Sequence, residues 1–222
     1  MELRTDKIRA CFDRKIGNFT ELWNLSTNTN YVRCAPRDPL IELYGLKNGE
    51  RVKLSGHISD EAEAPDALIL SYDSFGEYDI SAKVTCRCEQ DRLVFSAEIC
   101  NHSTIDVTEI LMPHLGGIYP GNGQKDYLIY PHHAGDKTED PVYNYAENRL
   151  TFWRGCSVPF EDIYRREINY CGLASMSWMY YYNSCGGFYI GSHDPRFPVT
   201  GVIAETLSLI HISEPTRLAL IS

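Results

Sequence analysis

Apolar and polar residues alternate along the middle of the chain, in strand-length stretches joined by short polar connections. These stretches are Ala67–Tyr72, Tyr78–Cys88, Arg92–Asn101 and Asp106–Leu111. In the second of them, Val84, Cys86 and Cys88 alternate with polar neighbours. An alternation of period two puts the apolar side chains on one face of a strand. The pattern therefore predicts an antiparallel meander with one packed face, in which the two cysteines are buried.

Strand patterns continue on both sides of this meander. Ile8–Phe12 and Phe19–Trp23 flank a turn-forming segment and predict an N-terminal hairpin. Pro39–Tyr44 and Val52–Ser55 flank an Asn-Gly pair, which is a strong hairpin signal. Only Phe160–Arg166 has a pattern that suits one or two helical turns. The fold class that follows is all-β, a two-sheet antiparallel β-sandwich.

The stretch Ala174–Asp194 (ASMSWMYYYNSCGGFYIGSHD) predicts a hairpin of two aromatic strands around the turn 183–186. Because side chains alternate, Trp178, Tyr180 and Tyr182 share one side of the first strand. We expect this hairpin to be the last part of the sandwich. It ends in His193-Asp194, at a strand end where binding groups often lie.

The composition and net charge limit the classes of partner that we expect the chain to bind. The 222 residues carry a net charge of −9, which argues against nucleic acid or an anionic membrane and suits a neutral ligand such as a sugar. The chain has no apolar run of about 18 residues, so we expect no transmembrane helix. Its first residues are charged and do not resemble a signal peptide, and its eight cysteines are scattered without a CxxC pair. A reduced, cytoplasmic protein is the expectation.

The candidate substrate-binding residues lie at predicted strand ends or on the aromatic hairpin. They are His132, His133, Trp178, His193 and Asp194. Adjacent histidines on a strand point to opposite faces, so we expect no metal site and no cofactor. The histidines suit either an acid–base role or the anchoring of loops, and the second is favoured. Trp178, like Trp153 and Tyr119, suits either stacking on a sugar ring or core packing, and core packing is favoured for Trp178.

The residues do not identify a catalytic group. No GxSxG nucleophile elbow is present, and the adjacent acidic pairs 139–140 and 161–162 lie in predicted loops. The pair of carboxylates that glycoside hydrolysis requires is therefore not assigned.

The tail Leu207–Arg217 (LSLIHISEPTR) resembles the translation of a transposase-type sequencing adapter, and the frame continues into Leu218. Such a scar is excluded from fold reasoning. We therefore expect one sandwich domain over residues 1–206 and a non-native tail over 207–222. On this hypothesis the gene continues beyond Thr206.

Three segments resemble the N-terminal region of uncharacterised bacterial glycoside-hydrolase-like proteins. They are Phe12–Trp23 (FDRKIGNFTELW), Met112–Gly135 (MPHLGGIYPGNGQKDYLIYPHHAG) and Ala174–Asp194. The resemblance implies a galactose-mutarotase-like β-supersandwich followed by a (β/α) barrel, which carries the catalytic carboxylates at its strand ends. It implies a sandwich that supports this missing barrel, contributes loops to its substrate cleft and is inactive alone.

Two other functions remain open. True mutarotases use a His and a Glu of the sandwich itself, and this pair is not matched here residue by residue. A sugar epimerase and a non-catalytic carbohydrate-binding module are therefore the alternatives. All three hypotheses share one partner, a carbohydrate such as an oligosaccharide or glycan.

Overall fold

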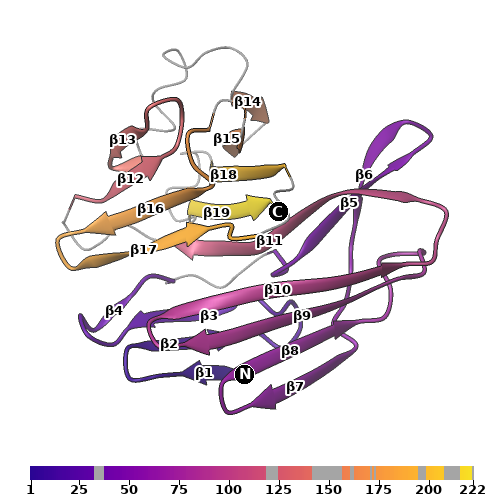
Figure 1. Cartoon of the computed structure of the whole chain (residues 1–222), viewed down its shortest axis with the longest axis horizontal. Helices are drawn as coiled ribbons and strands as arrows, with labels where there is room; N and C mark the ends of the chain where they lie inside the picture. The colour runs from indigo at the N-terminus through magenta and orange to yellow at the C-terminus, as the bar shows by residue number, and fades with distance from the viewer. Residues whose placement is uncertain are drawn as a thin grey trace. The chain divides into compact units, whose positions relative to one another are not determined.

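The computed structural model describes residues 1–32, 38–118, 125–141, 157–160, 163–170, 172, 174–194, 199–207 and 216–221. Within these residues, every element with assigned bounds is a β-strand (Figure 1). The all-β prediction is therefore confirmed. The helical turns expected over Phe160–Arg166 are wrong, because this segment contributes to β14 (Ser157–Phe160) and β15 (Ile163–Tyr170), which pair as a hairpin. The strand expected at 150–154 lies outside the described residues.

The chain divides into two compact units, Met1–His114 and Leu115–Ser222. In the first unit, the N-terminal sheet has the strand order β1-β2-β3-β4. Its strands are β1 (Glu2–Arg4), β2 (Ile8–Phe12), β3 (Phe19–Asn24) and β4 (Thr29–Asn30). Phe12 and Phe19 pack with ring centroids 4.8 Å apart, and Phe19 meets Phe95 edge-on at 5.9 Å. The predicted N-terminal hairpin is thus confirmed, and its aromatic side chains join the core.

The meander forms the second sheet of this unit, in the order β10-β9-β8-β7 (Figure 1). Its strands are β7 (Asp60–Ala64), β8 (Ala67–Tyr72), β9 (Ile80–Glu89) and β10 (Arg92–Asn101). Val84, Cys86 and Cys88 are buried, as the alternation predicts. The edge strand β7 was not predicted, because the only apolar residues of its sequence DEAEA are two exposed alanines, which give no buried face.

The fourth predicted strand of the meander pairs elsewhere. Asp106–Leu111 begins β11 (Asp106–Ile118), which pairs with β5 (Glu42–Lys47). A hairpin joins β5 to β6 (Glu50–Leu54). Its turn residues Asn48 and Gly49 have φ of 54° and 82°. Positive φ at both central residues is what a tight hairpin turn of type I′ requires, so the Asn-Gly prediction is confirmed.

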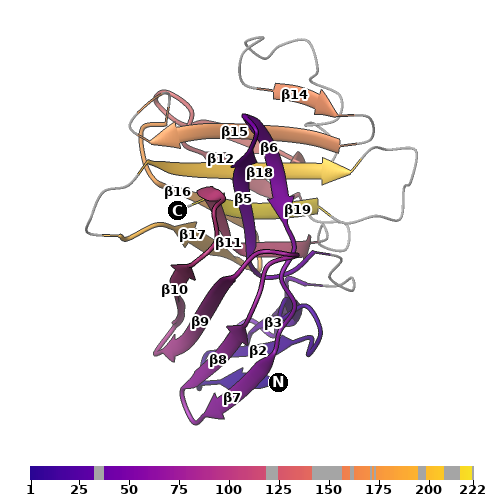
Figure 2. The ribbon, with the colours of Figure 1, turned by 90° about the vertical axis from the view of Figure 1, so that its right-hand side faces the viewer.

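The second unit contains a four-stranded sheet in the order β13-β12-β16-β17. Its strands are β12 (Tyr127–Tyr130), β13 (Asp136–Glu139), β16 (Trp178–Asn183) and β17 (Gly186–Gly191). The aromatic hairpin is confirmed, with Asn183 opposite Gly186 at its turn. It is not the last element, because β18 (Thr200–Leu207) follows it and pairs with β15 (Figure 2). The Tyr130 hydroxyl donates to the Val202 carbonyl at 2.8 Å and ties β12 to β18.

The tail contributes one further strand, β19 (Thr216–Ile221), which runs antiparallel to β18. Its sequence TRLALI is mostly apolar, and such a segment readily extends a sheet. The adapter origin of residues 207–222 concerns the nucleotide sequence, so it stays a prediction. The single domain expected over residues 1–206 also stays a prediction.

Candidate functional site

The sheet of β12, β13, β16 and β17 has two chemically different faces. One face carries Leu128, Tyr130, Met179, Tyr181 and Ile190, which are all buried. On β16 the residues between them, Trp178, Tyr180 and Tyr182, are only half-buried. The predicted alternation of this strand is therefore confirmed, and Trp178 lies outside the fully buried core, contrary to the role favoured for it.

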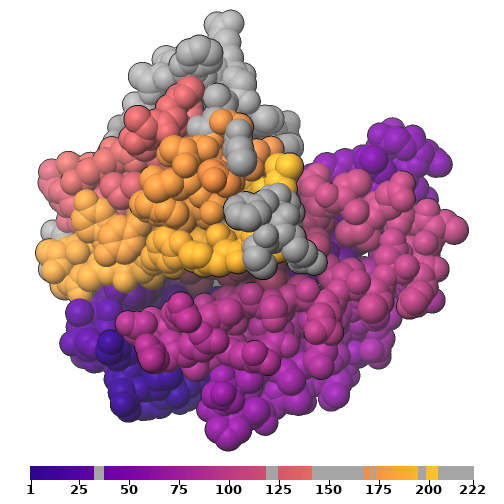
Figure 3. Space-filling view, viewed as in Figure 1, coloured from indigo at the N-terminus to yellow at the C-terminus, as the bar shows by residue number. Residues whose placement is uncertain are grey.

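The half-buried side of this sheet forms an aromatic face. We define it by Tyr127, Trp178, Tyr180, Tyr182 and Tyr189. Tyr182 stacks on Tyr180 and on Tyr127, with ring centroids 5.1 and 5.2 Å apart. Trp178 contacts Tyr189 at 5.7 Å, and Tyr189 is 47% exposed. In the space-filling view the strands that carry this face adjoin one another on the surface of the second unit (Figure 3).

Glycines on β17 make room for these rings. Gly187 lies opposite Tyr182, and Gly191 lies opposite Trp178. A Cβ added to Gly191 would lie 2.9 Å from the Trp178 Cβ and would also collide with the Tyr189 hydroxyl. The GGFYIG sequence of β17 therefore lets the large side chains of β16 lean across their neighbouring strand.

Polar groups border the aromatic face at both ends. At one end, Tyr189 Oη lies 3.0 Å from His193 Nε2. Desolvation raises the pKa of Tyr189, so its phenol stays protonated at neutral pH and can donate a hydrogen bond. At the other end, the Lys137 ammonium lies 4.2 Å from the Tyr127 ring centroid and 5.8 Å from that of Tyr182. Hydrogen bonding with the Tyr182 hydroxyl raises the pKa of Lys137, which keeps its positive charge.

His132 and His133 form a separate pair. His132 is buried, its Nδ1 lies 3.2 Å from Asp136 Oδ2, and its backbone bridges Ala174. His133 is exposed in a turn with φ of 50°, and the two rings lie 4.2 Å apart. The expectation that they point to opposite faces of a strand is therefore wrong, because the chain turns at His133 and brings the rings together. The contacts of His132 with Asp136 and Ala174 agree with a loop-anchoring role for that residue.

The predicted substrate-binding residues thus divide between two places. Trp178 and His193 are linked through Tyr189, and Asp194 is half-buried directly after His193. His132 and His133 belong to the turn after β12. Tyr119 and Trp153 lie outside the described residues. Sequence reasoning missed Tyr127, Tyr189 and Lys137 as site residues, although alternation along β13 places Lys137 and Glu139 on one face.

The buried carboxylate of Asp126, just before β12, connects this strand to β16. Asp126 is 1% exposed, and its Oδ2 accepts a hydrogen bond from the Tyr181 hydroxyl at 2.6 Å. Its Oδ1 accepts another from Asn183 Nδ2 at 3.0 Å. Hydrogen bonds to a charged group that is out of water are among the strong ones. Asp126 therefore positions β16 beside β12 rather than taking part in chemistry at the surface.

The first unit contains another buried polar cluster, which the sequence did not reveal. Glu42 is 4% exposed, and it accepts hydrogen bonds from Lys53 Nζ at 2.6 Å and from the Tyr44 hydroxyl at 3.0 Å. His114 is equally buried, with its Nδ1 3.8 Å from Glu42 Oε1. Burial alone would raise the pKa of Glu42, but the neighbouring His114 and Lys53 lower it to about 2. Lys53 lowers this pKa more than His114 does, because its Nζ lies 2.6 Å from Glu42, whereas His114 Nδ1, at 3.8 Å, is too far for a hydrogen bond.

This Glu–His pair does not form an open site. Both side chains are at most 5% exposed, so neither reaches a sugar in the surrounding solvent. The one sequence signal for this cluster is the glutamate within the otherwise apolar run 40–43 (LIEL), which points to a buried Glu42 but not to its partner. The contacts of Glu42 with Lys53 and His114 connect β5 to β6 and to β11.

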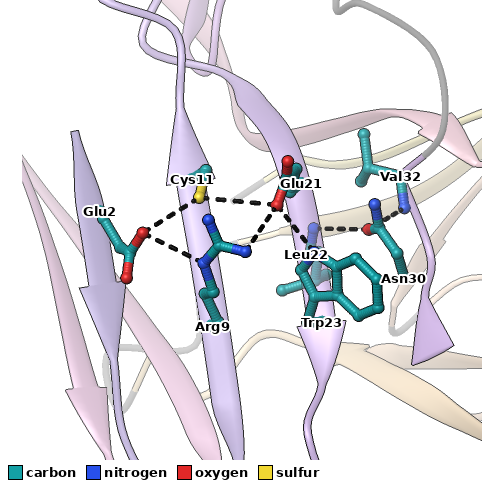
Figure 4. A network of polar contacts seen from close by, with 8 residues as sticks. All are labelled: Glu2, Arg9, Cys11, Glu21, Leu22, Trp23, Asn30 and Val32. Carbon is teal, nitrogen blue, oxygen red and sulfur yellow. Dashed lines mark hydrogen bonds and ion pairs between the residues drawn. The ribbon is translucent and has the colours of Figure 1, made fainter. Parts of the chain in front are cut away.

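A third network lies on the N-terminal sheet (Figure 4). The Arg9 guanidinium bridges Glu2 at 3.1 Å and Glu21 at 3.2 Å, and Trp23 Nε1 donates to Glu21 at 2.8 Å. The Cys11 thiol lies 3.6 Å from Glu2. Burial raises the pKa of Cys11, so it is a poor nucleophile, and Arg9 already occupies both carboxylates. The network is a cross-strand ladder of ion pairs and not a reactive centre.

Within the described part of the chain, no group of His, Cys, Asp and Glu side chains is arranged to hold a metal ion. Among the same residues, no helix has the length and apolar character needed to cross a membrane.

Comparisons with known proteins identify the fold and nothing finer. No protein-family model and no curated protein matches the chain. Among solved structures, a galactose mutarotase related enzyme from Lactobacillus acidophilus matches with a TM-score of 0.52 and 7% sequence identity. The match covers 100% of this chain and 84% of that one. The chain therefore has a galactose-mutarotase-like β-sandwich fold, as its sequence predicts. At 7% identity the likeness assigns no residue a role.

Proposed function

We propose that this sandwich binds carbohydrate, and that sugar rings pack against the outward edges of the aromatic face of β12, β16 and β17, since the rings of Tyr180, Tyr182 and Tyr127 already stack on one another. The observation that carries the proposal is the row of half-buried rings on one side of the sheet, with Tyr189 at its exposed edge. An aromatic ring offers a flat apolar surface, and tyrosine adds a polar tip. A pyranose has the complementary character, with apolar C–H groups on its faces and hydroxyls around its edge.

Polar groups beside the rings supply orientation. His193 and the tyrosine hydroxyls can donate to or accept from sugar hydroxyls. A few placed polar groups around an apolar surface are typical of small-molecule sites. The fold likeness to a galactose mutarotase related enzyme supports the same class of ligand. In this proposal, Trp178 and His193 keep the substrate-binding role predicted for them, together with Asp194, whereas His132 and His133 shape the turn after β12.

The role of the sandwich within a larger protein is a finer proposal. The resemblance of the three sequence segments supports a glycosidase parent whose catalytic barrel follows the sandwich. On this proposal the present chain contributes substrate contacts and performs no hydrolysis. The purified 222-residue chain should leave aryl glycosides intact over hours, and appreciable turnover would contradict this role.

Calorimetric titration of the full chain with a panel of oligosaccharides tests the binding proposal. We expect heat of binding with at least one oligosaccharide, and its loss in Tyr182→Ala and Trp178→Ala. The matched control is Trp23→Ala, which removes a half-buried aromatic side chain from the N-terminal sheet. Far-UV circular dichroism confirms that each variant is folded. Equal binding by the wild type and both aromatic-face variants would contradict the proposal.

A further inference from the structure

The ammonium group of Lys137 lies against one end of the aromatic face. Lys137 belongs to β13, where it lies opposite Ile129 of β12. Its side chain is exposed, yet its ammonium lies over the Tyr127 ring and near that of Tyr182. A lysine in this position has part of its charge stabilised by the ring electrons and still has N–H donors to offer. The aromatic face thus ends in a fixed positive charge.

The charges around Lys137 do not cancel it. Glu139 lies on the same side of β13 but forms an ion pair with Lys125. Asp136 points to the other side, where it meets His132. Among the residues that the structure describes, no carboxylate lies within ion-pair distance of Lys137, although Glu139 is near enough to raise its pKa slightly. Lys137 therefore has no direct ionic partner among the described residues, although Asp136, Glu139 and Asp140 lie within three residues of it in the sequence.

We propose that the sugar held by the aromatic face carries an anionic group, either a carboxylate or a sulfate ester, and that Lys137 binds this group. The inference rests on the proposed carbohydrate-binding function. A neutral sugar would need only the rings and hydroxyls, whereas a cation held over the Tyr127 ring complements an anionic group on a sugar bound beside it. The lysine ammonium is a compact point charge, so it can form an ion pair with either a carboxylate or a sulfate ester.

The test compares three oligosaccharides of equal length by calorimetry at low and at physiological salt. They are an oligogalacturonate, a sulfated galacto-oligosaccharide and a neutral galacto-oligosaccharide. We expect an anionic oligosaccharide to bind more tightly than the neutral one, with an advantage that shrinks as salt rises. Lys137→Gln should raise the Kd of the anionic oligosaccharide about three- to fivefold, as expected for the loss of an exposed ion pair, and leave the Kd of the neutral one unchanged. Lys137→Arg should restore binding.

Lys125→Gln is the matched control, because it removes the same charge from a neighbouring lysine that is already paired with Glu139. An equal loss in both lysine variants would mean a diffuse charge effect and would overturn the inference. Equal affinity for all three oligosaccharides, unchanged in Lys137→Gln, would overturn it and leave the carbohydrate-binding proposal standing. Failure of all three to bind would overturn both. Preference for the uronate or for the sulfate identifies which anion Lys137 recognises.

Discussion

Acid should lower the stability of the first unit through protonation of one buried carboxyl group, that of Glu42. Its pKa is lowered from 4.5 to about 2 by Lys53 and His114, against the opposing effect of burial. A carboxyl whose pKa falls on folding stabilises the native state above its unfolded pKa. That stability is lost as pH falls through the folded pKa. A shift of this size corresponds to roughly 3 kcal/mol at neutral pH, because each pKa unit is about 1.4 kcal/mol. The relevant window therefore runs from about pH 4.5 down to about pH 2.

The experiment compares the wild type with Glu42→Gln by urea unfolding. At pH 6 the variant should be less stable by roughly 3 kcal/mol, and at pH 3 the difference should shrink by about 2 kcal/mol, to roughly 1 kcal/mol. Equal m-values for the two proteins make their free energies comparable. Glu50→Gln is the control, since Glu50 is an exposed carboxyl on the same hairpin. A stability difference that is constant between pH 6 and pH 3, or a titration of the Glu42 carboxyl carbon near its ordinary value by NMR, would refute the reasoning.

Three further predictions address packing. Tyr181→Phe removes a hydrogen bond to a buried carboxylate and should cost about 1 to 3 kcal/mol in urea unfolding, so an unchanged midpoint would contradict that bond. Gly191→Ala drives a methyl group into the aromatic face and should lower the melting temperature. Gly116→Ala, where a Cβ meets nothing within 4 Å, should be tolerated, and equal effects would count against the described packing. In the folded protein, Cys100 should be alkylated rapidly and Cys86 only after unfolding, because burial raises the pKa of Cys86; mass spectrometry locates the label.

The sequence predicted those elements whose alternation reflects one buried and one exposed face. The strands β8 and β9 and the aromatic hairpin follow this rule, and their positions agree with the structure. Strands without a buried face escaped prediction, as β7 shows, because nothing in DEAEA distinguishes an edge strand from a loop. The predicted partner of β11 was also wrong, since its pairing with β5 joins segments far apart in the chain and the local pattern does not encode it.

The candidate site was predicted in part for a similar reason. Alternation placed Trp178, Tyr180 and Tyr182 on one side of a strand, and the structure agrees. It could not show that Tyr127 and Lys137, about 40 to 55 residues earlier in the chain, join the same surface through the pairing of β12 with β16 and β13. The histidine pair was misjudged because β12 ends at Tyr130 and His133 takes a left-handed conformation in the turn that follows.

Aromatic-resolved NMR of the full chain, titrated with the oligogalacturonate, the sulfated and the neutral galacto-oligosaccharides, tests the central claim most directly. The account predicts that ring signals of Trp178, Tyr180, Tyr182 and Tyr189 shift together on binding, while those of Trp23 on the N-terminal sheet stay in place. The claim would be contradicted if none of the three sugars moved the aromatic-face signals at millimolar concentration. It would equally be contradicted if the shifts were concentrated at Trp23.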